Sequence, residues 1–265
     1  ALITGGSVRL GREIGLAFAR AGWNVACHYN HSEAEAHALC AEVRALGVDA
    51  LAVQGDLEDE ASCQSMFDTT AAITGTTLRC VVNNASLFVP DEGTDFDEAQ
   101  ALAQLKVNLM APMRLGKWMA ALHGAPTPSN DPASASSVAK PSIIHVLDQK
   151  VFNLNPDYFS YTLSKLALER AVSLQAQSLA PTLRVNAVAP GLMYPSGPQS
   201  QANFERASHV NLLRQPINPA DVAASVVFLA GNASITGTTL RVDNGQHLVP
   251  LARDVMFVTE EVFKS

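Results

Sequence analysis

The sequence has few cysteines and few charged residues, and both shortages exclude classes of protein. Its 265 residues include four cysteines, with no C-x-x-C pair and no histidine at metal-ligand spacing. Structural zinc or another metal and a disulfide framework are therefore not expected. This cysteine usage favours a reducing compartment, so we expect a cytoplasmic protein.

Positive charge is scarcer than negative charge, because 18 lysines and arginines stand against 25 aspartates and glutamates. The formal net charge of -7 argues against a nucleic-acid partner, for which a basic patch is typical. No apolar run approaches the roughly eighteen residues of a membrane span, and no charged-then-apolar leader stands before the first motif. We therefore expect neither membrane nor nucleic acid as a partner, and any anionic ligand must be held by local groups.

Short apolar runs alternate with amphipathic stretches along the whole chain. The runs predicted to be strands are Ala1 to Ile3, Asn24 to Tyr29, Ala50 to Gln54, Leu78 to Val82, Ile143 to Leu147, Leu183 to Ala189 and Thr239 to Val242. Strands separated by helices of about ten to fifteen residues are typical of a doubly wound sheet. We predict an α/β fold with one Rossmann-type domain over residues 1–265, in which a seven-stranded parallel sheet has helices on both faces. Ligands of such sheets bind beyond the carboxyl ends of the strands.

The first predicted strand leads into the turn Thr4 to Gly11, which reads T-G-x-x-x-R-x-G and precedes an amphipathic helix. Gly5 lets the backbone approach a pyrophosphate at the helix N-terminus, and Arg9, followed by Leu10, adds a bidentate donor. The alternative is a plain glycine-rich turn between strand and helix.

The second strand ends without the acidic residue that pairs with the ribose hydroxyls of NAD. The residues found there instead are His28, Tyr29, Asn30 and Ser32. Polar donors without a carboxylate tolerate a 2′-phosphate, so NADP is favoured over NAD, although histidines in a turn are more often solvated surface. After the third strand, Asp56 and Leu57 are candidates for the adenine site, but Asp56 as the cap of the next helix is the better-supported reading.

The fourth strand is followed by Asn84, Ala85, Ser86 and, two residues on, Phe88. An aromatic side chain at the mouth of the crevice can stack on a flat ring, or it can be a hydrophobic plug. Residues 97–122 are predicted to be a long helical region interrupted at Pro112. Asn108 lies within it, and asparagine inside a helix suggests a kink or a bound water.

The stretch from Ser142 to Glu169 carries an acid, a phenol and an ammonium. Asp148 ends a buried apolar run, and Tyr161 and Lys165 are four residues apart on the next helix, so they share a face. An ammonium next to a phenol favours the ionised phenol, which suits a proton donor near neutral pH. A chance Tyr and Lys on a surface helix is the alternative.

The composition of the chain predicts the character of three further segments. The sixth strand ends at Pro190, Gly191 and Leu192. Residues 123–140 are expected to be a surface excursion, 194–211 a lid over the crevice or a linker, and 246–265 an apolar tail that docks on its own or a neighbouring subunit.

Five motifs in order resemble the short-chain dehydrogenase/reductase family. They are the T-G-x-x-x-R-x-G turn, N-N-A from Asn83 to Ala85, Asn108, Y-x-x-x-K at Tyr161 and Lys165, and P-G at Pro190 and Gly191. The resemblance implies that Tyr161 donates a proton, that Lys165 holds the nicotinamide ribose and lowers the pKa of the tyrosine, and that Asn108 supports a water chain. It also implies a homo-oligomer, in this family a tetramer.

Two departures narrow the resemblance. Asp148 stands where the family usually has a catalytic serine, and Ser86 ends what is usually N-N-A-G. Together with Arg9 and H-Y-x-x-S from His28 to Ser32, they resemble pteridine reductases and the related bacterial dihydromonapterin reductases. This subgroup implies that Phe88 stacks a pterin against nicotinamide, that Asp148 takes part in proton delivery and that Arg9 binds both phosphate and pterin.

The implied substrate site also includes Ser86, Tyr161 and Leu192. His31 stands where the parasite enzymes of the subgroup have a further arginine. The expected function is NADPH-dependent reduction of a small pterin. The alternatives are a ketone reductase acting on a 3-oxoacyl thioester or a xenobiotic carbonyl, and a regulator that binds NADP without turnover.

Overall fold

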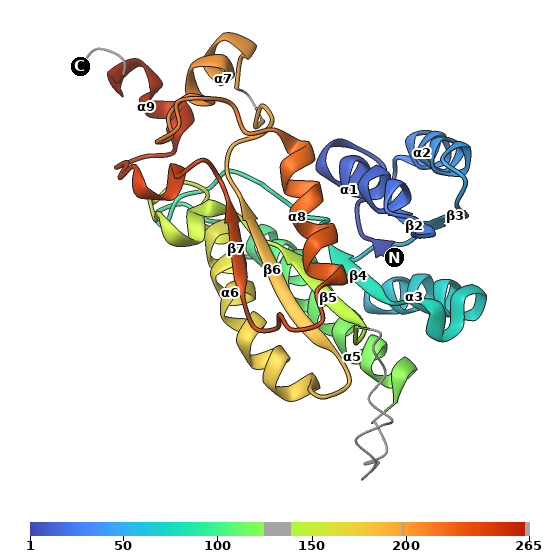
Figure 1. The fold of residues 1–265 in the computed structure, drawn as a ribbon. Coiled ribbons are helices and arrows are strands. Elements are labelled where there is room, and N and C mark those ends of the chain that lie inside the picture. Colours follow the sequence, from blue (N-terminus) through green and yellow to red (C-terminus); the bar gives the residue numbers. More distant parts are fainter. Residues whose placement is uncertain (125–138, 198, 263–265) are drawn as a thin grey trace.

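The computed structural model describes residues 1–124, 139–197 and 199–262, and it contains one all-parallel sheet between two layers of helices (Figure 1). The strands are β1 (Leu2–Ile3), β2 (Val25–Tyr29), β3 (Ala50–Gln54), β4 (Cys80–Asn83), β5 (Ser142–Val146), β6 (Arg184–Pro190) and β7 (Thr239–Val242). Their order is β3-β2-β1-β4-β5-β6-β7. The predicted fold class is confirmed, and the order reverses between β1 and β4, where ligands of doubly wound sheets bind.

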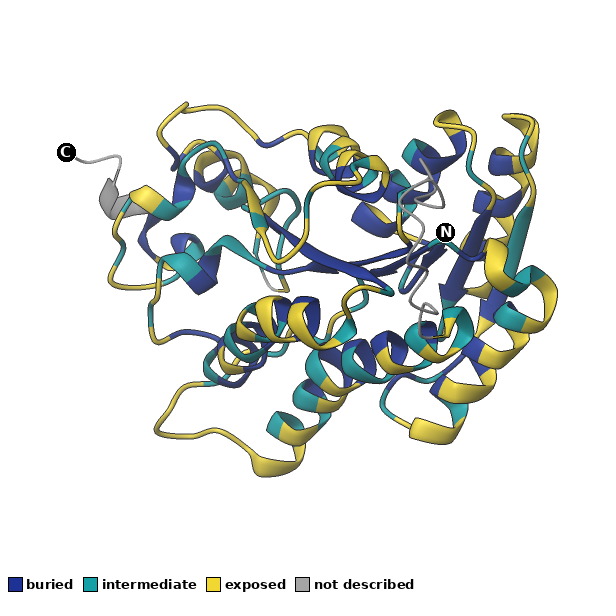
Figure 2. Ribbon diagram, turned by 60° about the horizontal axis from the view of Figure 1, so that its bottom comes forward, coloured by how far each residue is buried: buried dark blue, intermediate teal, exposed yellow. Residues whose placement is uncertain are grey.

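The helices divide between the two faces of the sheet. One layer consists of α1 (Arg9–Arg20), α2 (Glu33–Ala45) and α8 (Pro219–Gly231), and the other of α3 (Glu60–Thr74), α4 (Glu98–Leu105), α5 (Ala111–His123) and α6 (Phe159–Leu179). Every residue of β4, β5 and β6 is buried, and Figure 2 shows these strands in dark blue between the layers. A sheet covered on both faces explains why the strands read as continuous apolar runs.

The start of α3 corrects one prediction. Asp59, not Asp56, caps this helix, since its carboxylate accepts from the Ser62 N–H at 2.7 Å. Asp56 lies in the preceding loop, where its Oδ1 accepts from the Glu58 N–H at 2.9 Å. Leu57 is buried in the core beside α3, so its side chain packs rather than binds a ligand.

The helical region after residue 97 is interrupted, but not at Pro112 as predicted. A π-helical turn over Lys106–Met110 separates α4 from α5, and Pro112 lies in the first turn of α5. Proline is tolerated there because the first N–H groups of a helix have no intrahelical partner. Asn108 is in the π-turn, and turns of this kind are frequent at functional sites.

The C-terminal part of the chain covers the carboxyl edge of the sheet (Figure 1). The segment predicted as a lid contains α7 (Gln201–Ala207), and the predicted tail contains α9 (Val255–Val262). Ala207 and Val210 pack against Val255, so these two segments support each other. The excursion predicted over 123–140 falls almost entirely outside the described residues.

Candidate active site

A cavity of about 590 Å³ opens at the carboxyl ends of the strands. Of the predicted site residues, it is lined by Gly5, Arg9, Leu10, Asn84, Ala85, Ser86, Phe88, Asp148, Tyr161, Lys165, Pro190, Gly191 and Leu192. The predicted residues outside its lining are His28, Tyr29, Asn30, Ser32, Asp56, Leu57 and Asn108. Its volume lies in the range of roughly 300–1,000 Å³ that is usual for small-molecule and cofactor sites.

The glycine turn is fastened to the end of β4. Gly5 has φ 57°, and a Cβ added there would lie 3.0 Å from the Cα of Ala85. The Asn84 side chain donates to the carbonyls of Thr4 and Gly5, each at 3.0 Å. Only glycine fits this approach, and the Asn84 amide holds the turn in place.

His28 corrects the prediction that it belongs to a cofactor-binding turn. It is a buried residue of β2, its Nδ1 accepts from the Gly5 N–H at 3.0 Å, and its Nε2 lies 3.0 Å from the Gly55 carbonyl. Nε2 therefore carries the proton, and burial lowers the pKa of the ring. Both nitrogens are used by the backbone, so His28 shapes the glycine turn and has no donor left for a cofactor.

The end of β2 carries polar side chains without a carboxylate. Tyr29 is its last residue, Asn30 follows, and Ser32 precedes α2 without making a side-chain cap bond. No carboxylate occurs from Tyr29 to Ser32. This stretch fits a 2′-phosphorylated ribose better than a free 2′-hydroxyl.

The first turn of α1 presents donors to the crevice. Val8 precedes α1, and its side chain makes no capping hydrogen bond. The first backbone N–H groups of α1 are therefore not occupied by an N-cap side chain. The Arg9 guanidinium donates to the Pro195 carbonyl at 2.6 Å and lies 5.0 Å from the centre of the Tyr194 ring. These residues fit a dinucleotide diphosphate, and Arg9 connects that position to the loop after β6.

Asp148, Tyr161 and Lys165 meet at the floor of the crevice. The Tyr161 hydroxyl donates to Asp148 Oδ2 at 2.9 Å. Lys165 Nζ donates to the Val146 carbonyl at 2.8 Å and lies 5.8 Å from the centre of the Tyr161 ring. Tyr161 and Lys165 are buried and Asp148 is half-buried, so the acid, phenol and ammonium form one compact group.

The pKa directions in this group contradict one prediction. Burial and the adjacent Asp148 carboxylate raise the pKa of the Tyr161 phenol well above its ordinary value, a direction opposite to the lowering expected from Lys165. Burial lowers the pKa of Lys165 to about 8, and burial raises the pKa of Asp148 despite the bonds that it accepts. The Asp148 carboxylate is the charged group nearer to the phenol, because it accepts a hydrogen bond directly from the Tyr161 hydroxyl.

The Asn108 side chain joins the loop after β4 to α6. Its Oδ1 accepts from the Leu87 N–H at 2.8 Å and from Ser86 Oγ at 3.1 Å. Its Nδ2 donates to the Leu87 carbonyl and to Ser164 Oγ, each at 2.9 Å. All four hydrogen-bonding positions of the side chain are filled by protein, and the role of Asn108 in a water chain stays a prediction.

Phe88 is held by two tyrosines. Its ring stacks on Tyr158 with centres 4.1 Å apart and planes 20° apart, and it meets the edge of Tyr161 at 4.6 Å. One face of Phe88 is therefore covered by protein. The ring lines the crevice at a fixed orientation, beside the phenol of Tyr161.

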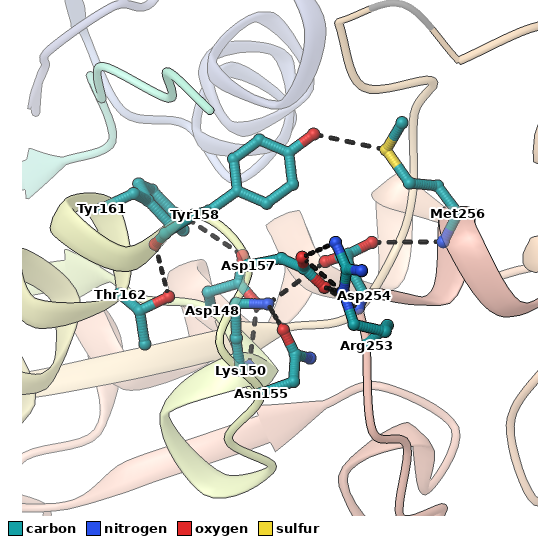
Figure 3. Close-up of polar contacts among 10 residues, drawn as sticks. All are labelled: Asp148, Lys150, Asn155, Asp157, Tyr158, Tyr161, Thr162, Arg253, Asp254 and Met256. Carbon is teal, nitrogen blue, oxygen red and sulfur yellow. Dashed lines mark hydrogen bonds and ion pairs between the residues drawn. The ribbon is translucent and has the colours of Figure 1, made fainter. Parts of the chain in front are cut away.

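A charged cluster beside Asp148 was missed by the sequence reasoning (Figure 3). The Lys150 N–H donates to Asp148 Oδ1 at 2.8 Å, and its ammonium lies 3.3 Å from Asp254 Oδ2. Lys150 and Asp254 are 104 residues apart in the chain. A single sequence gives no signal for such a pair, although a lysine two residues after the strand-end acid was visible.

Comparisons with known proteins agree with this geometry. The family model described as Enoyl-(Acyl carrier protein) reductase matches residues 8–247. The chain belongs to the short-chain dehydrogenase/reductase family. It is 27% identical to a 3-oxoacyl-[acyl-carrier-protein] reductase FabG of Staphylococcus aureus, over 94% of this chain and 98% of that protein.

Two further relatives carry pterin or folate names. The chain is 28% identical to pteridine reductase 1 of Leishmania tarentolae, over 94% of this chain and 96% of that protein. It is 34% identical to FolM alternative dihydrofolate reductase 1 of Brucella canis, solved with NADP, with a TM-score of 0.80 and 93% of each chain covered. The chain is thus a short-chain oxidoreductase with relatives that act on different substrates.

Two classes of feature are missing from the described residues. Over 1–124, 139–197 and 199–262, no helix is long and apolar enough to span a membrane. Within the same ranges, no three or more His, Cys, Asp or Glu side chains cluster in a way that could hold a metal ion.

Proposed function

We propose that this protein is an NADPH-dependent pterin reductase, which converts a dihydropterin to a tetrahydropterin. The observation that carries the proposal is the 2.9 Å bond from the Tyr161 hydroxyl to Asp148 Oδ2 at the floor of the crevice. Phe88 beside it offers a flat aromatic surface to a planar ring, and Arg9 offers a cation at the other side.

NADP(H) supplies the hydride when bound, and the similarity to a FolM enzyme solved with NADP supports this choice of cofactor. Gly5, Arg9 and the start of α1 would hold its diphosphate, and the end of β2 its 2′-phosphate. Lys165 would donate to the nicotinamide ribose while its pKa of about 8 keeps most of it charged at pH 7.

Reduction of a C=N bond needs hydride at carbon and a proton at nitrogen. Asp148 has a raised pKa, so its protonated form persists to higher pH than that of an exposed aspartate. A protonated Asp148 can donate to the Tyr161 oxygen, which frees the phenol O–H to point into the crevice. The phenol O–H bond then breaks toward the ring nitrogen, and the proton of Asp148 replaces it on Tyr161.

A ketone reductase is the second candidate, supported by the 27% identity to FabG. Asp148 weighs against it, because the serine hydroxyl that usually donates to a substrate carbonyl is replaced here by a carboxyl group whose Oδ2 is bonded to Tyr161. Fold alone does not separate the two.

The test is NADPH oxidation by the purified protein with dihydrobiopterin, dihydrofolate and an acetoacetyl thioester side by side. The proposal expects turnover of at least one of the two pterin substrates, at a higher kcat/KM than the thioester. Turnover of the thioester alone would establish the ketone reductase, and NADPH binding without any turnover would establish a regulator.

A further inference from the structure

An acid from near the C-terminus reaches the catalytic loop. Asp254 lies just before α9 and lines the crevice, whereas Lys150 lies two residues after Asp148 (Figure 3). The ion pair between them measures 3.3 Å, and the Lys150 side chain is only 3% exposed. A buried ammonium is thereby neutralised by the C-terminal segment.

Lys150 is also tied directly to the catalytic acid. Its backbone N–H donates to Asp148 Oδ1, the carboxylate whose other oxygen accepts from Tyr161. Its ammonium donates to Asn155 Oδ1 and lies 5.8 Å from the centre of the Tyr158 ring. Asp148 therefore has two charged neighbours, the Lys150 ammonium and the Asp254 carboxylate, which have opposite effects on its pKa.

The C-terminal segment is held in this place by contacts of its own. Arg253 Nε donates to Asp157 Oδ1 at 2.8 Å, and the same guanidinium lies 3.2 Å from Glu92. The Tyr158 hydroxyl donates to the sulfur of Met256 at 3.2 Å. Asp254 lies between these anchors, so its carboxylate is kept near Lys150.

We propose that Lys150 and Asp254 are a positioning pair that sets the proton affinity of Asp148, and through it the pH range in which this site delivers protons. The proton-delivery part rests on the proposed function. The other groups that face Asp148 are Tyr161 and Lys165 from α6, while Asp157 and Arg253 pair with each other farther out.

The two members act on Asp148 with opposite sign. The Lys150 charge lowers the pKa of Asp148 and the Asp254 charge raises it, within a net rise caused chiefly by burial. Asp254→Asn leaves Lys150 unopposed and is expected to lower the titration midpoint of Asp148 by about one pH unit. Lys150→Met leaves Asp254 unopposed and is expected to raise it by a similar amount.

The measurement is an infrared titration of the protonated carboxyl of Asp148, identified as the band that Asp148→Asn removes. It is made on the whole protein without substrate, for wild type, both single variants and the double variant Lys150→Met/Asp254→Asn. The double variant loses both charges, so its midpoint is expected to return close to that of wild type. Glu92→Gln, which removes an exposed negative charge farther out and leaves the Arg253–Asp157 pair in place, is the matched control and is expected to titrate like wild type.

Shifts in opposite directions support the proposal. Equal midpoints in all variants, shifts in one direction only, or a wild-type band that never appears would each overturn it. If Lys150→Met does not fold, Lys150→Gln keeps a bond to Asn155 without the charge and is expected to shift upward as well. Failure of wild type to reduce any pterin would defeat the proposed function but leave this titration unaffected.

Discussion

Single residues decide the chemistry of this site. Asp148 and Tyr161 share a hydrogen bond, and burial raises the pKa of both groups. The Asp148 carboxylate raises the pKa of Tyr161 further, whereas the bond from Tyr161 lowers that of Asp148. Lys165 next to them has a pKa lowered to about 8. Burial thus shifts all three groups toward their neutral forms, although Lys165 stays mostly charged at pH 7.

The preference for NADPH over NADH is also expected to depend on single residues, those at the end of β2. Asn30→Asp adds one negative charge there at almost unchanged volume. We expect it to weaken NADPH binding by about tenfold or more, through repulsion of the 2′-phosphate, and to leave NADH binding unchanged or stronger. Dissociation constants from fluorescence titration measure this.

Asn24→Asp is the control, because Asn24 precedes β2 at the opposite edge of the sheet and is exposed. It is expected to leave both affinities unchanged. An Asn30→Asp protein that binds NADPH as wild type does would show that the 2′-phosphate does not lie near the end of β2.

Burial of Lys165 gives a prediction about stability and pH. Its folded-state pKa of about 8 lies below its ordinary value, so the unfolded chain binds more protons between about pH 8 and 10. The penalty is fully present below pH 8 and is relieved as pH rises. Lys165→Met is expected to raise the free energy of unfolding at pH 7 by roughly 1–3 kcal/mol, while turnover falls sharply.

Urea unfolding at pH 7 and at pH 10 measures this, and the gain over wild type is expected to shrink at the higher pH. Lys117→Met, at an exposed position of α5, is the control and is expected to show neither effect. A Lys165→Met protein that is less stable than wild type at pH 7 would show that the bond to the Val146 carbonyl outweighs the desolvation.

At the scale of helices and turns, the π-turn over Lys106–Met110 is the element that fixes the site. It places Asn108 so that one amide joins the loop at Ser86 and Leu87 to Ser164 on α6. Phe88 follows that loop, so its orientation beside Tyr161 depends on the same bonds. The element works by positioning the aromatic wall of the crevice.

Loss of this amide is expected to destabilise the fold. Asn108→Ala leaves several buried groups without partners, at a cost of roughly 2–4 kcal/mol. Asn24→Ala, which loses one bond at an exposed position, is expected to cost less than about 1 kcal/mol. Chemical denaturation compares the two, and equal losses would show that the bonds of Asn108 contribute no more than surface ones.

The elements also show where sequence reasoning reaches its limit. The central strands β4, β5 and β6 were the most readily predictable, because runs buried on both faces read as continuous apolar segments. The π-turn before Ala111 was not predictable, because a proline marks a possible helix end but does not indicate whether a π-turn precedes it. Asp56 was predicted as the cap of α3 although Asp59 caps it, because cap geometry depends on loop dihedrals that the sequence does not reveal.

For the whole molecule, the crevice gathers residues from the glycine turn to α9. The spacing of Tyr161 and Lys165 was readable because it is local, four residues on one helix face. His28 and the pair of Lys150 and Asp254 were not, because their partners lie 23 and 104 residues away and only the folded chain joins them. Many of the predicted site residues therefore line one crevice, whereas the charged pair of Lys150 and Asp254 beside it was not predicted.

Asp148→Ser tests the central claim most directly. Turnover of dihydrobiopterin and of an acetoacetyl thioester or simple ketone is measured for wild type and variant under the same NADPH concentration. We expect kcat/KM for the pterin to fall about 100-fold or more, because the second proton source is lost, while kcat/KM for the ketone falls much less or rises. Equal losses on both substrates would contradict the assignment of Asp148 to pterin protonation.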